Sequence, residues 1–497
     1  MNANVEGPGK SGGTLGLAFA ALALCVGGCM VGPNYHRPEV SVPAAYPQTL
    51  TSSTNQPSLE LSQWWRVFRD PQLDTLIDQA TLANFDLRLA QARVREVRAQ
   101  AGIARSALFP SADANGEYSR QRLSGHTPEG LLARGTDQSL EQNLYDAGFD
   151  ANWELDIFGG NRRGLQAAKA DLGATEESRR GVLITVISDV GLNYLDLRGL
   201  QKQLTVARDN LRLQEDTLAL TRDQFRAGLA NELDTARAEA QAANTRSQIP
   251  LLEQEIQRSI HRLSILIGKE PAELESQFAM VAPIPSATPT IPVGLPSELL
   301  RRRPDIRQAE REVAAATARV GVATADLFPR FFLTGAAGLQ SLNASDFFSG
   351  GSRFWSIGPS MKWPIFTAGR IRQNIKVQDA RQEQSLIRYE QTVLTSLEEV
   401  ENALVACAKE EEHHQALVQA EAANRRAVEL AGQRYRSGLV DFLNVLETQR
   451  SLLAVQDDLA RSERTTDQNL VRLYKALGGG WEMETQLAGA SPNIHQN

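Results

Sequence analysis

A glycine-centred segment occurs twice in this chain, and the two copies lie 210 residues apart. In residues 435–450, Gly438 separates a long polar sequence from a short apolar patch, and Gly228 stands in the same context earlier in the chain. Each copy closes at a second glycine, Gly268 or Gly478. Such an internal repeat predicts one architecture built twice. We expect each copy to be a long helix running to a turn and a long helix running back, with both turns at one end of an elongated molecule.

Proline, which breaks helices, is missing from the sequences that flank both turns. None occurs between Pro128 and Pro250, where average usage would place about six, and none occurs in residues 366–490. We therefore predict helical hairpins over about residues 162–268 and 370–478. The first outgoing helix would be about 100 Å long, and Pro250 should bend the first returning helix.

A shorter helical pattern precedes each hairpin. In the first copy it begins near Trp64 and Trp65, and apolar residues recur every three or four positions over residues 74–107 until a Leu-Phe-Pro corner stops them. Residues 305–326 repeat this pattern in the second copy and end at the same corner. The order of helix, strands and hairpin is therefore expected twice.

Between each short helix and its hairpin the sequence alternates with a period of two, which indicates β-strands. We predict strands within about residues 111–157 and 330–365. Strict alternation of apolar and acidic residues over 145–157 puts the acids on one face. A soluble sandwich strand would also fit, but this length suits a membrane-barrel strand better. The positions predicted to line a channel are Asp146, Asp150, Asn152, Glu154 and Asp156.

Four strands per chain are too few to close a barrel. Open strand edges in hydrocarbon would leave backbone groups unpaired at several kcal/mol each, so the chain must oligomerise. Two chains would give eight strands, whose interior is normally filled by side chains, whereas three give twelve strands and a water-filled bore. We therefore predict a trimer in which the apolar stripes of twelve long helices pack sideways into a tube.

The N-terminus has the features of a lipoprotein signal. Its apolar run, residues 15–26, is too short to cross a bilayer core but suits a signal peptide, which we place at residues 1–28. Small residues precede Cys29 as in a bacterial lipobox, so Cys29 is predicted to become the lipidated first residue. The alternative is a signal that is cleaved elsewhere, with Cys29 as a bystander. If Cys29 is lipidated, Cys407 is the only thiol left free, and no disulfide can form within the mature chain.

Several of these features occur together in one known family. After the lipobox come Met-Val-Gly-Pro-Asn-Tyr, the tryptophan pair at 64–65, Trp-Glu-Leu-Asp-Ile-Phe-Gly at 153–159, the Leu-Phe-Pro corners and the turn of residues 435–450. In this order the sequence resembles the outer-membrane channel lipoproteins of tripartite efflux pumps, the TolC and OprM superfamily, of the NodT type. The resemblance covers nearly the whole mature chain.

The resemblance implies a mainly α fold with a membrane β-barrel. A homotrimer would form a twelve-stranded barrel, a long periplasmic α-helical barrel and a mixed α/β equatorial domain. The implied function is a gated duct that passes small molecules such as drugs from the periplasm to the exterior, anchored by lipid at Cys29 in the outer membrane of a Gram-negative bacterium. The implied partners are a periplasmic adaptor (membrane fusion) protein and an inner-membrane pump, commonly of the resistance-nodulation-division class.

Proline-rich stretches mark the predicted boundaries along the chain. Six prolines fall between Pro283 and Pro304, where we place the junction between the two copies. The predicted divisions are a signal peptide at 1–28, a lipidated extended tether at 29–60, a first outer-membrane efflux repeat at 61–282, a linker at 283–304, a second repeat at 305–480 and a C-terminal tail at 481–497.

The resemblance also implies a gate on the helix after the second turn. By residue match its side chains are Leu443, Glu447 and Arg450, with Glu447 standing where the family carries Asp. Three carboxylates around an axis would make a throat that attracts cations. The alternative is that Leu443 is a core residue and that Glu447 and Arg450 form an ordinary i, i+3 pair, worth only ~0.3 kcal/mol on an exposed helix.

Other classes of site and function are disfavoured. A net charge of −7 without a clustered basic face argues against nucleic acid. The run from Glu410 to His414 indicates a solvated face and not a metal site, because adjacent helical positions point to different sides. No catalytic constellation and no cofactor-binding motif stand out, so we do not expect an enzyme. Two other functions remain open: a duct for protein secretion, and a coiled-coil lipoprotein spacer without a pore.

Overall fold

The computed structural model describes residues 30–44, 59–136, 139–285 and 296–482. The predicted signal peptide and Cys29 lie outside these residues, as do parts of the predicted tether, linker and C-terminal tail. The chain divides into two compact units. One, the sheet unit, contains residues 95–174 and 310–388 with the described residues up to Pro38, and the other, the hairpin unit, contains the rest.

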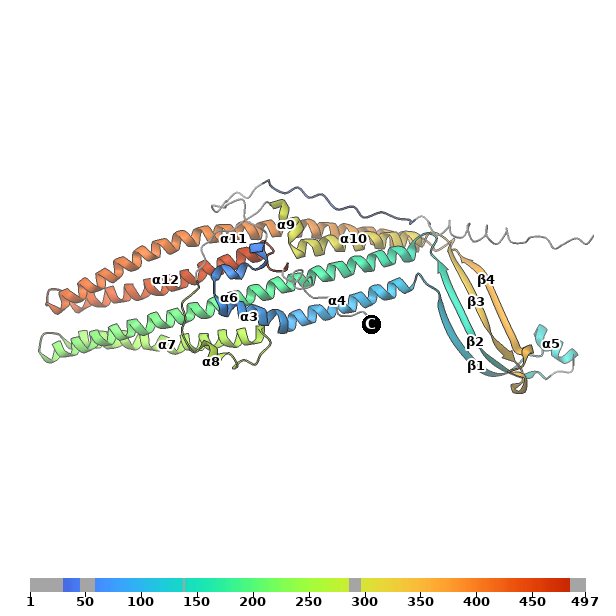
Figure 1. Cartoon of the computed structure of the whole chain (residues 1–497), viewed down its shortest axis with the longest axis horizontal. Helices are drawn as coiled ribbons and strands as arrows, with labels where there is room; N and C mark the ends of the chain where they lie inside the picture. The colour runs from blue at the N-terminus through green and yellow to red at the C-terminus, as the bar shows by residue number, and fades with distance from the viewer. Residues whose placement is uncertain (1–29, 45–58, 137–138, 286–295, 483–497) are drawn as a thin grey trace, which may run out of the picture. The chain divides into compact units, whose positions relative to one another are not determined.

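Corresponding helices of the two copies have equal lengths. The short helices α4 (Phe85–Ser106) and α10 (Pro304–Ala325) have 22 residues each. The outgoing hairpin helices α6 (Gly160–Arg226) and α11 (Arg370–Arg436) have 67 residues each, and the returning helices α7 (Glu232–Leu266) and α12 (Phe442–Ala476) have 35 each (Figure 1). The repeat predicted from the sequence is therefore a repeat of structure. Within the described part of the chain, no helix is both long and apolar enough to cross a membrane.

The two hairpin turns close in the same way. Gly228 and Gly438 have backbone φ angles of 76° and 67°, in the left-handed region that glycine adopts without strain. At the first turn the Leu229 N–H donates to the Gln224 carbonyl at 2.8 Å, and at the second the Leu439 N–H donates to the Arg434 carbonyl at 2.9 Å. These bonds satisfy carbonyls at the end of each outgoing helix, so both turns are built by local sequence.

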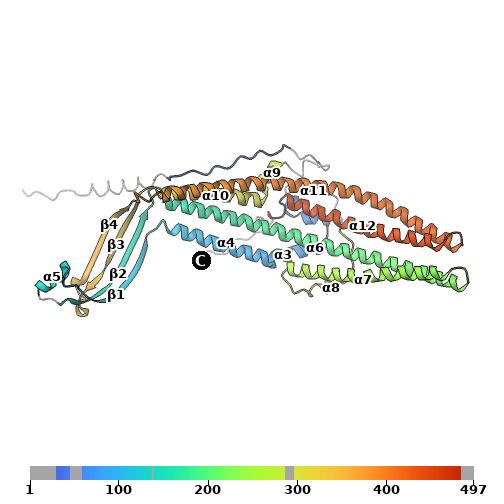
Figure 2. The ribbon, with the colours of Figure 1, turned by 180° about the vertical axis from the view of Figure 1, so that it is seen from behind.

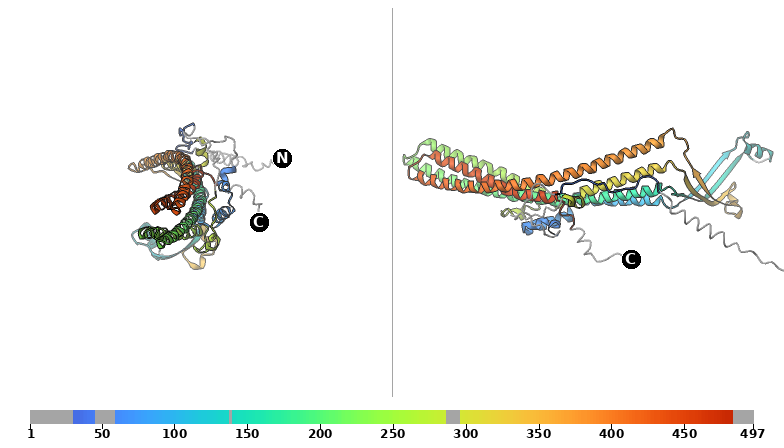
Figure 3. Two further views of the ribbon diagram at one scale, coloured as in Figure 1. Left: turned by 90° about the vertical axis from the view of Figure 1, so that its left-hand side faces the viewer. Right: turned by 90° about the horizontal axis from the view of Figure 1, so that it is seen from above.

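The two hairpins lie side by side within the hairpin unit (Figure 2), and the right-hand view of Figure 3 shows this from above. Thr217 on α6 accepts a hydrogen bond from Gln449 on α12 at 2.8 Å. Small elements pack at the base of the hairpins, where Trp64 stacks on Tyr474 with ring centroids 5.5 Å apart. These elements are α2 (Leu59–Ser62), η1 (Trp64–Phe68), α3 (Pro71–Ala83), α8 (Glu275–Phe278) and α9 (Pro296–Arg302).

The helix predicted to run without interruption over residues 74–107 is broken at Asn84. The backbone of Asn84 leaves the helical conformation, with ψ of 133°, and the Asn84 side-chain oxygen accepts from the N–H groups of Asp86 and Leu87 at 2.9 and 3.1 Å. The Asn84 side chain thus caps the first turn of α4, while its amide donates to the Leu266 carbonyl at 2.9 Å. The prediction was wrong here because the apolar spacing runs on through the break.

The four strands form one antiparallel sheet in chain order (Figure 1). They are β1 (Ser111–Arg122), β2 (Glu141–Leu155), β3 (Arg330–Ser341) and β4 (Arg353–Lys362). A short helix that the sequence analysis missed, α5 (Pro128–Gly135), joins β1 to β2, and Thr127 caps it by accepting from the Gly130 N–H at 3.3 Å. The 3-10 turns η2 (Ala344–Asp346) and η3 (Gly350–Ser352) join β3 to β4.

Matching corners end the sheet on the side where the helices join it. The indole N–H of Trp153 donates to the Leu108 carbonyl at 3.1 Å, and that of Trp363 donates to the Leu327 carbonyl at the same distance. Both carbonyls belong to the predicted Leu-Phe-Pro corners. Trp363 lies just beyond β4, so the alternation seen in the sequence runs past the end of the hydrogen-bonded strand.

Candidate functional site

The first turns of α12 have one buried face. Phe442, Val445 and Leu446 are buried in a cluster with Tyr435 of α11 and Ala238 of α7. Leu218, Leu220, Ala431 and Val440 pack against this cluster. Apolar residues three and four positions apart lie on one side of a helix, so this side of α12 holds the tips of the two hairpins together.

The predicted gate residues lie on the other side of the same helix. Leu443 is 46 % exposed, whereas its neighbour Phe442 is 2 % exposed. Glu447 and Arg450 are also exposed. The alternative that Leu443 belongs to the core of its own chain therefore has no support in the structure.

Arg450 does not form the i, i+3 pair with Glu447 that the alternative to the gate supposes. Its Nε donates instead to the side-chain oxygen of Gln241 on α7, at 2.8 Å. Among the residues that the structure describes, Glu447 has no ion-pair partner. The stripe of three residues is therefore present, but its arginine is tied to the other hairpin of the same chain.

Polar contacts tie α12 to its neighbours along most of its length. Asn210 on α6 donates to Gln456 at 2.8 Å, and Gln456 donates to Glu421 on α11 at 2.9 Å. Hydrogen bonds from Arg425 and Gln456 hold the pKa of the Glu421 carboxyl below its usual range. Three more polar pairs link α12 to its neighbours: Lys202–Glu463 and Asp196–Arg464 join it to α6, and Glu410–Ser462 joins it to α11. Glu410 therefore contacts α12, although it was expected on a solvated face. The described residues contain no cluster of acids and histidines suited to a metal.

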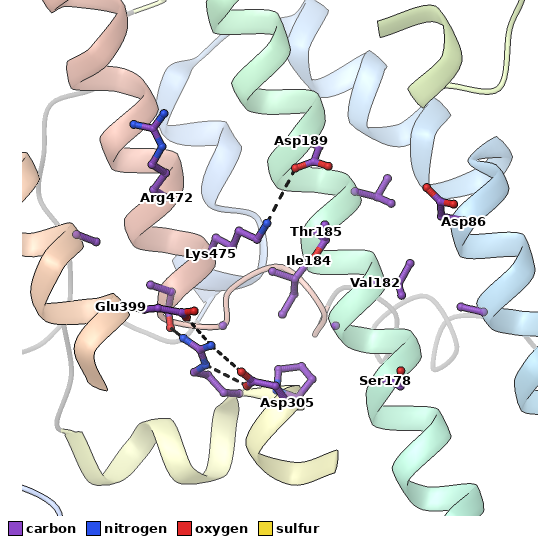
Figure 4. Close-up of a pocket in the computed structure, with 18 of the residues that line it drawn as sticks. Asp86, Ser178, Val182, Ile184, Thr185, Asp189, Asp305, Glu399, Arg472 and Lys475 are labelled. Atoms are coloured by element: carbon purple, nitrogen blue, oxygen red, sulfur yellow. Dashed lines mark hydrogen bonds and ion pairs between the residues drawn. The ribbon is translucent and has the colours of Figure 1, made fainter. Parts of the chain in front are cut away.

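A cavity of about 1030 Å³ lies at the base of α12 (Figure 4). On its wall, Arg303 donates to Asp305 from Nε and Nη2 at 3.0 and 2.7 Å and to Glu399 from Nη2 at 2.7 Å. Burial would lower the pKa of Arg303, but these carboxylates raise it. Its Nη1 also donates to the Ala476 carbonyl at 2.8 Å. Arg303 therefore fixes the C-terminal end of α12 to neighbouring elements.

The residues predicted to line a channel share one face of the sheet, with one exception. Asp146, Asp150, Asn152 and Glu154 alternate along β2. Asp156 lies beyond the strand, and its carboxylate accepts from the N–H groups of Asn161 and Arg162 at 3.1 and 2.8 Å. Asp156 thus caps α6 instead of lining the sheet, since the strand ends at Leu155.

The strand register adds two acids that the sequence analysis missed. Asp113 on β1 lies directly opposite Asp150, and Glu117 lies directly opposite Asp146. The signal for them was present as the alternation of Ser, Asp, Asn, Glu and Ser over residues 111–119. Asp146 also accepts from Gln340 on β3 at 3.1 Å. This face of β1 and β2 therefore carries paired carboxylates.

The opposite face of the sheet is apolar and exposed. Phe149 of β2 and Trp355 of β4 both pair with Ala337 of β3, so the three residues form one row across the sheet. The aromatic side chains are 68 % and 77 % exposed. Large apolar side chains on the outside and acids on the inside match a strand that contacts lipid on one face and water on the other.

The remaining predicted site, Cys29, lies outside the described residues. The chain immediately after it is described, and Met30 packs close to Gly159, just before the start of α6. Cys407 lies on α11 as a free thiol.

Comparison with known proteins shows similarity over almost the whole chain. The family described as "Outer membrane efflux protein" matches residues 76–269 and 295–479. The toluene efflux pump outer membrane protein TtgF of Pseudomonas putida is 36 % identical over 472 residues, which cover 93 % of this chain and 96 % of TtgF. Nodulation protein T of Rhizobium leguminosarum bv. trifolii is 31 % identical over 460 residues, 92 % of this chain and 96 % of that protein. The solved structure of the outer-membrane channel OprN superposes with a TM-score of 0.85 at 38 % identity, covering 91 % of this chain and 100 % of OprN.

Proposed function

From the premise that this chain belongs to the outer membrane efflux protein family, we propose that three copies assemble into its channel and that Leu443, Glu447 and Arg450 close the periplasmic mouth. The chain is the outer-membrane exit duct of a tripartite efflux pump and not an enzyme. It acts with an adaptor and an inner-membrane pump, and we assign the pump to the resistance-nodulation-division class. Its cargo would be small molecules, as the name of TtgF states for toluene.

The edges of the sheet support a trimer. Among the residues that the structure describes, β1 pairs only with β2 and β4 only with β3, so the outer edge of each of these two strands has no strand partner there. In a membrane the backbone groups of such an edge need partners from another chain. Pairing β4 of one copy with β1 of the next closes twelve strands after three copies and leaves a bore wide enough for water.

The paired carboxylates support a water-filled bore that favours cations. Like charges directly opposite on neighbouring strands destabilise a sheet, so Asp113 facing Asp150 is tolerable where water surrounds both. Repeated in three chains, these rows would line the bore with negative charge and attract cations. Asp146, Asn152 and Glu154 would belong to the same lining.

The hairpin tips are the surface that we assign to the adaptor. Leu229 and Leu439 follow the two turn glycines and are 80 % and 68 % exposed. They occupy equivalent positions in the two copies, so three chains would present six exposed leucines at the mouth. An apolar surface of this kind favours a protein partner. For the membrane end of the chain we propose acylation at Cys29.

One observation carries the gate proposal: Leu443, Glu447 and Arg450 share an exposed stripe on the helix whose other face holds the hairpin tips together. Spacings of four and three residues keep the three side chains aligned. Facing a threefold axis, Leu443 would narrow the mouth sterically and Glu447 would pair with a neighbouring chain. The base of α12 is fixed by Arg303, so movement is expected at the tip.

The test is single-channel conductance in planar bilayers. Leu443→Ala combined with Glu447→Ala should raise conductance several-fold, while the trimer stays intact by light scattering in mild detergent. The equivalent change in the first copy, Leu233→Ala, should have a smaller effect. Unchanged conductance in an intact trimer would place the constriction elsewhere, and a monodisperse monomer would overturn the proposed assembly.

A further inference from the structure

A buried arginine in the sheet unit holds the N-terminal segment, residues 31–35. Arg163, near the start of α6, is only 1 % exposed. Its Nε donates to the Val31 carbonyl at 3.1 Å, and its Nη2 donates to the Gly32 carbonyl at 3.2 Å and to the Asn34 side chain at 2.8 Å. Within the described residues it meets no carboxylate. Its Nη1 donates to the Gln166 side chain at 2.9 Å. A buried guanidinium is costly unless it is hydrogen-bonded, so the three bonds to the segment help to stabilise Arg163 in this position.

A glycine in the segment and a glycine on α10 allow the two backbones to pack closely. Gly32 has φ of +85°, and a Cβ added to it would lie 2.5 Å from the Cα of Gly321 on α10. A Cβ added to Gly321 would in turn lie 2.8 Å from Cδ of Arg163. The Val31 N–H donates to the Phe158 carbonyl at 3.2 Å. The segment therefore packs closely against α10 and against the residues that follow β2.

A second attachment follows three residues later. The Tyr35 hydroxyl donates to Oε1 of Glu310 on α10 at 3.1 Å, and Arg37 lies 3.1 Å from Oε2 of the same carboxylate. The Glu310 side chain is only 8 % exposed, so both contacts are made close to the helix. The first residues of the predicted tether are thus docked at two points.

We propose that Arg163 is a positioning residue that docks residues 31–35 and fixes the point at which the N-terminus leaves the fold. This proposal rests on the lipid attachment proposed at Cys29, which precedes Met30 in the sequence. The docking point at Phe158 is three residues past the end of β2, next to the corner of Trp153. Tryptophan is typical of membrane interfaces. Docking would therefore bring the acylated residue and the end of the sheet to the same level of the membrane.

The experiment treats the acylated, detergent-solubilised trimer with chymotrypsin and measures how fast the peptide bond after Tyr35 is cut. Docking should protect this bond. His36 appears as a new N-terminus when this bond is cut, and mass spectrometry measures its rate of appearance. Gly32→Ala should raise that rate at least tenfold, because alanine fits neither the φ angle nor the contact with Gly321. Arg163→Gln should do the same. Lys169→Gln, which removes an exposed cation from the same helix, should leave the rate unchanged.

The outcomes separate docking from acylation. Gly32→Ala acts on the segment and not on the helices, so it remains informative if Arg163→Gln fails to assemble. If Gly32→Ala is cut as slowly as the unchanged protein, the docking proposal is overturned. Labelling with a palmitate analogue tests the lipid separately: it should be lost in Cys29→Ser. Labelling that survives this change would rule out Cys29 as the acylation site. Protection of the bond after Tyr35 would still support docking in that case.

Discussion

Arg450 on α12 donates a hydrogen bond from Nε to the side-chain oxygen of Gln241 on α7, 2.8 Å away. The arginine assigned to the gate is therefore held by the first hairpin of its own chain. Glu447, one turn earlier, has no ion-pair partner in the described part of the chain and stays available to a neighbouring copy. In the proposed trimer, we therefore expect the Arg450–Gln241 bond to restrain opening at this stripe in each chain.

Removing the acceptor of that bond should make the channel open more often. A hydrogen bond to a charged group contributes about 1.5–3 kcal/mol, so Gln241→Ala should shift the ratio of open to closed channels by about tenfold or more. Open probability in planar bilayers measures this. Gln254→Ala, an exposed position on the same helix, is the matched control. If the two variants behave alike, the bond does not restrain the gate.

Neutralising the paired acids of the sheet should weaken the preference for cations. Asp113→Asn with Asp150→Asn removes two charges per chain from the proposed lining, and reversal potentials in a salt gradient should move toward those of an unselective pore. Relief of the like-charge pair should leave the thermal midpoint of the trimer equal or higher. Glu270→Gln, an exposed acid in the hairpin unit, is the control. An unchanged reversal potential would mean that these acids do not face the bore.

The two glycines near the second turn should respond to alanine with opposite signs. Gly438 has φ of 67° and open space around it, so Gly438→Ala costs the backbone strain alone, about 1–2 kcal/mol. Gly432 lies inside α11, where alanine is favoured by about 1 kcal/mol. Thermal unfolding should therefore show a lower midpoint for Gly438→Ala and a higher one for Gly432→Ala. A lower midpoint for both would contradict the assignment of the turn.

The thiol of Cys407 should be unreactive near neutral pH. Burial raises its pKa from 9.0 to about 11, so the thiolate is about a hundredfold scarcer at pH 8 than for an unburied thiol. Alkylation by iodoacetamide should be correspondingly slow and should accelerate as the pH rises toward 11. The stability gained from a neutral thiol is present below pH 9 and is lost between pH 9 and 11. Alkylation at pH 8 as fast as in the denatured chain would contradict this.

Local chemistry made much of the architecture predictable. The turns at Gly228 and Gly438 need a positive φ angle, and long proline-free sequences on both sides leave the helices free to propagate. The period of two over residues 145–155 likewise follows from strand geometry alone. These features depend on neighbours a few residues apart, so the sequence by itself determined the hairpins, the strands and the doubled order.

Contacts between distant residues were decided only by the tertiary structure. Asp156 continues the alternation of the sequence, yet it caps α6 because the strand ends before it. Asp113 lies opposite Asp150 because of the register between β1 and β2. Arg450 contacts Gln241, which belongs to the other hairpin of the same chain. Arg163 buries its charge against carbonyls more than a hundred residues away in the chain. Periodicity shows which side of a helix or strand a residue occupies, but the residue that it contacts on that side depends on how the helices and strands pack.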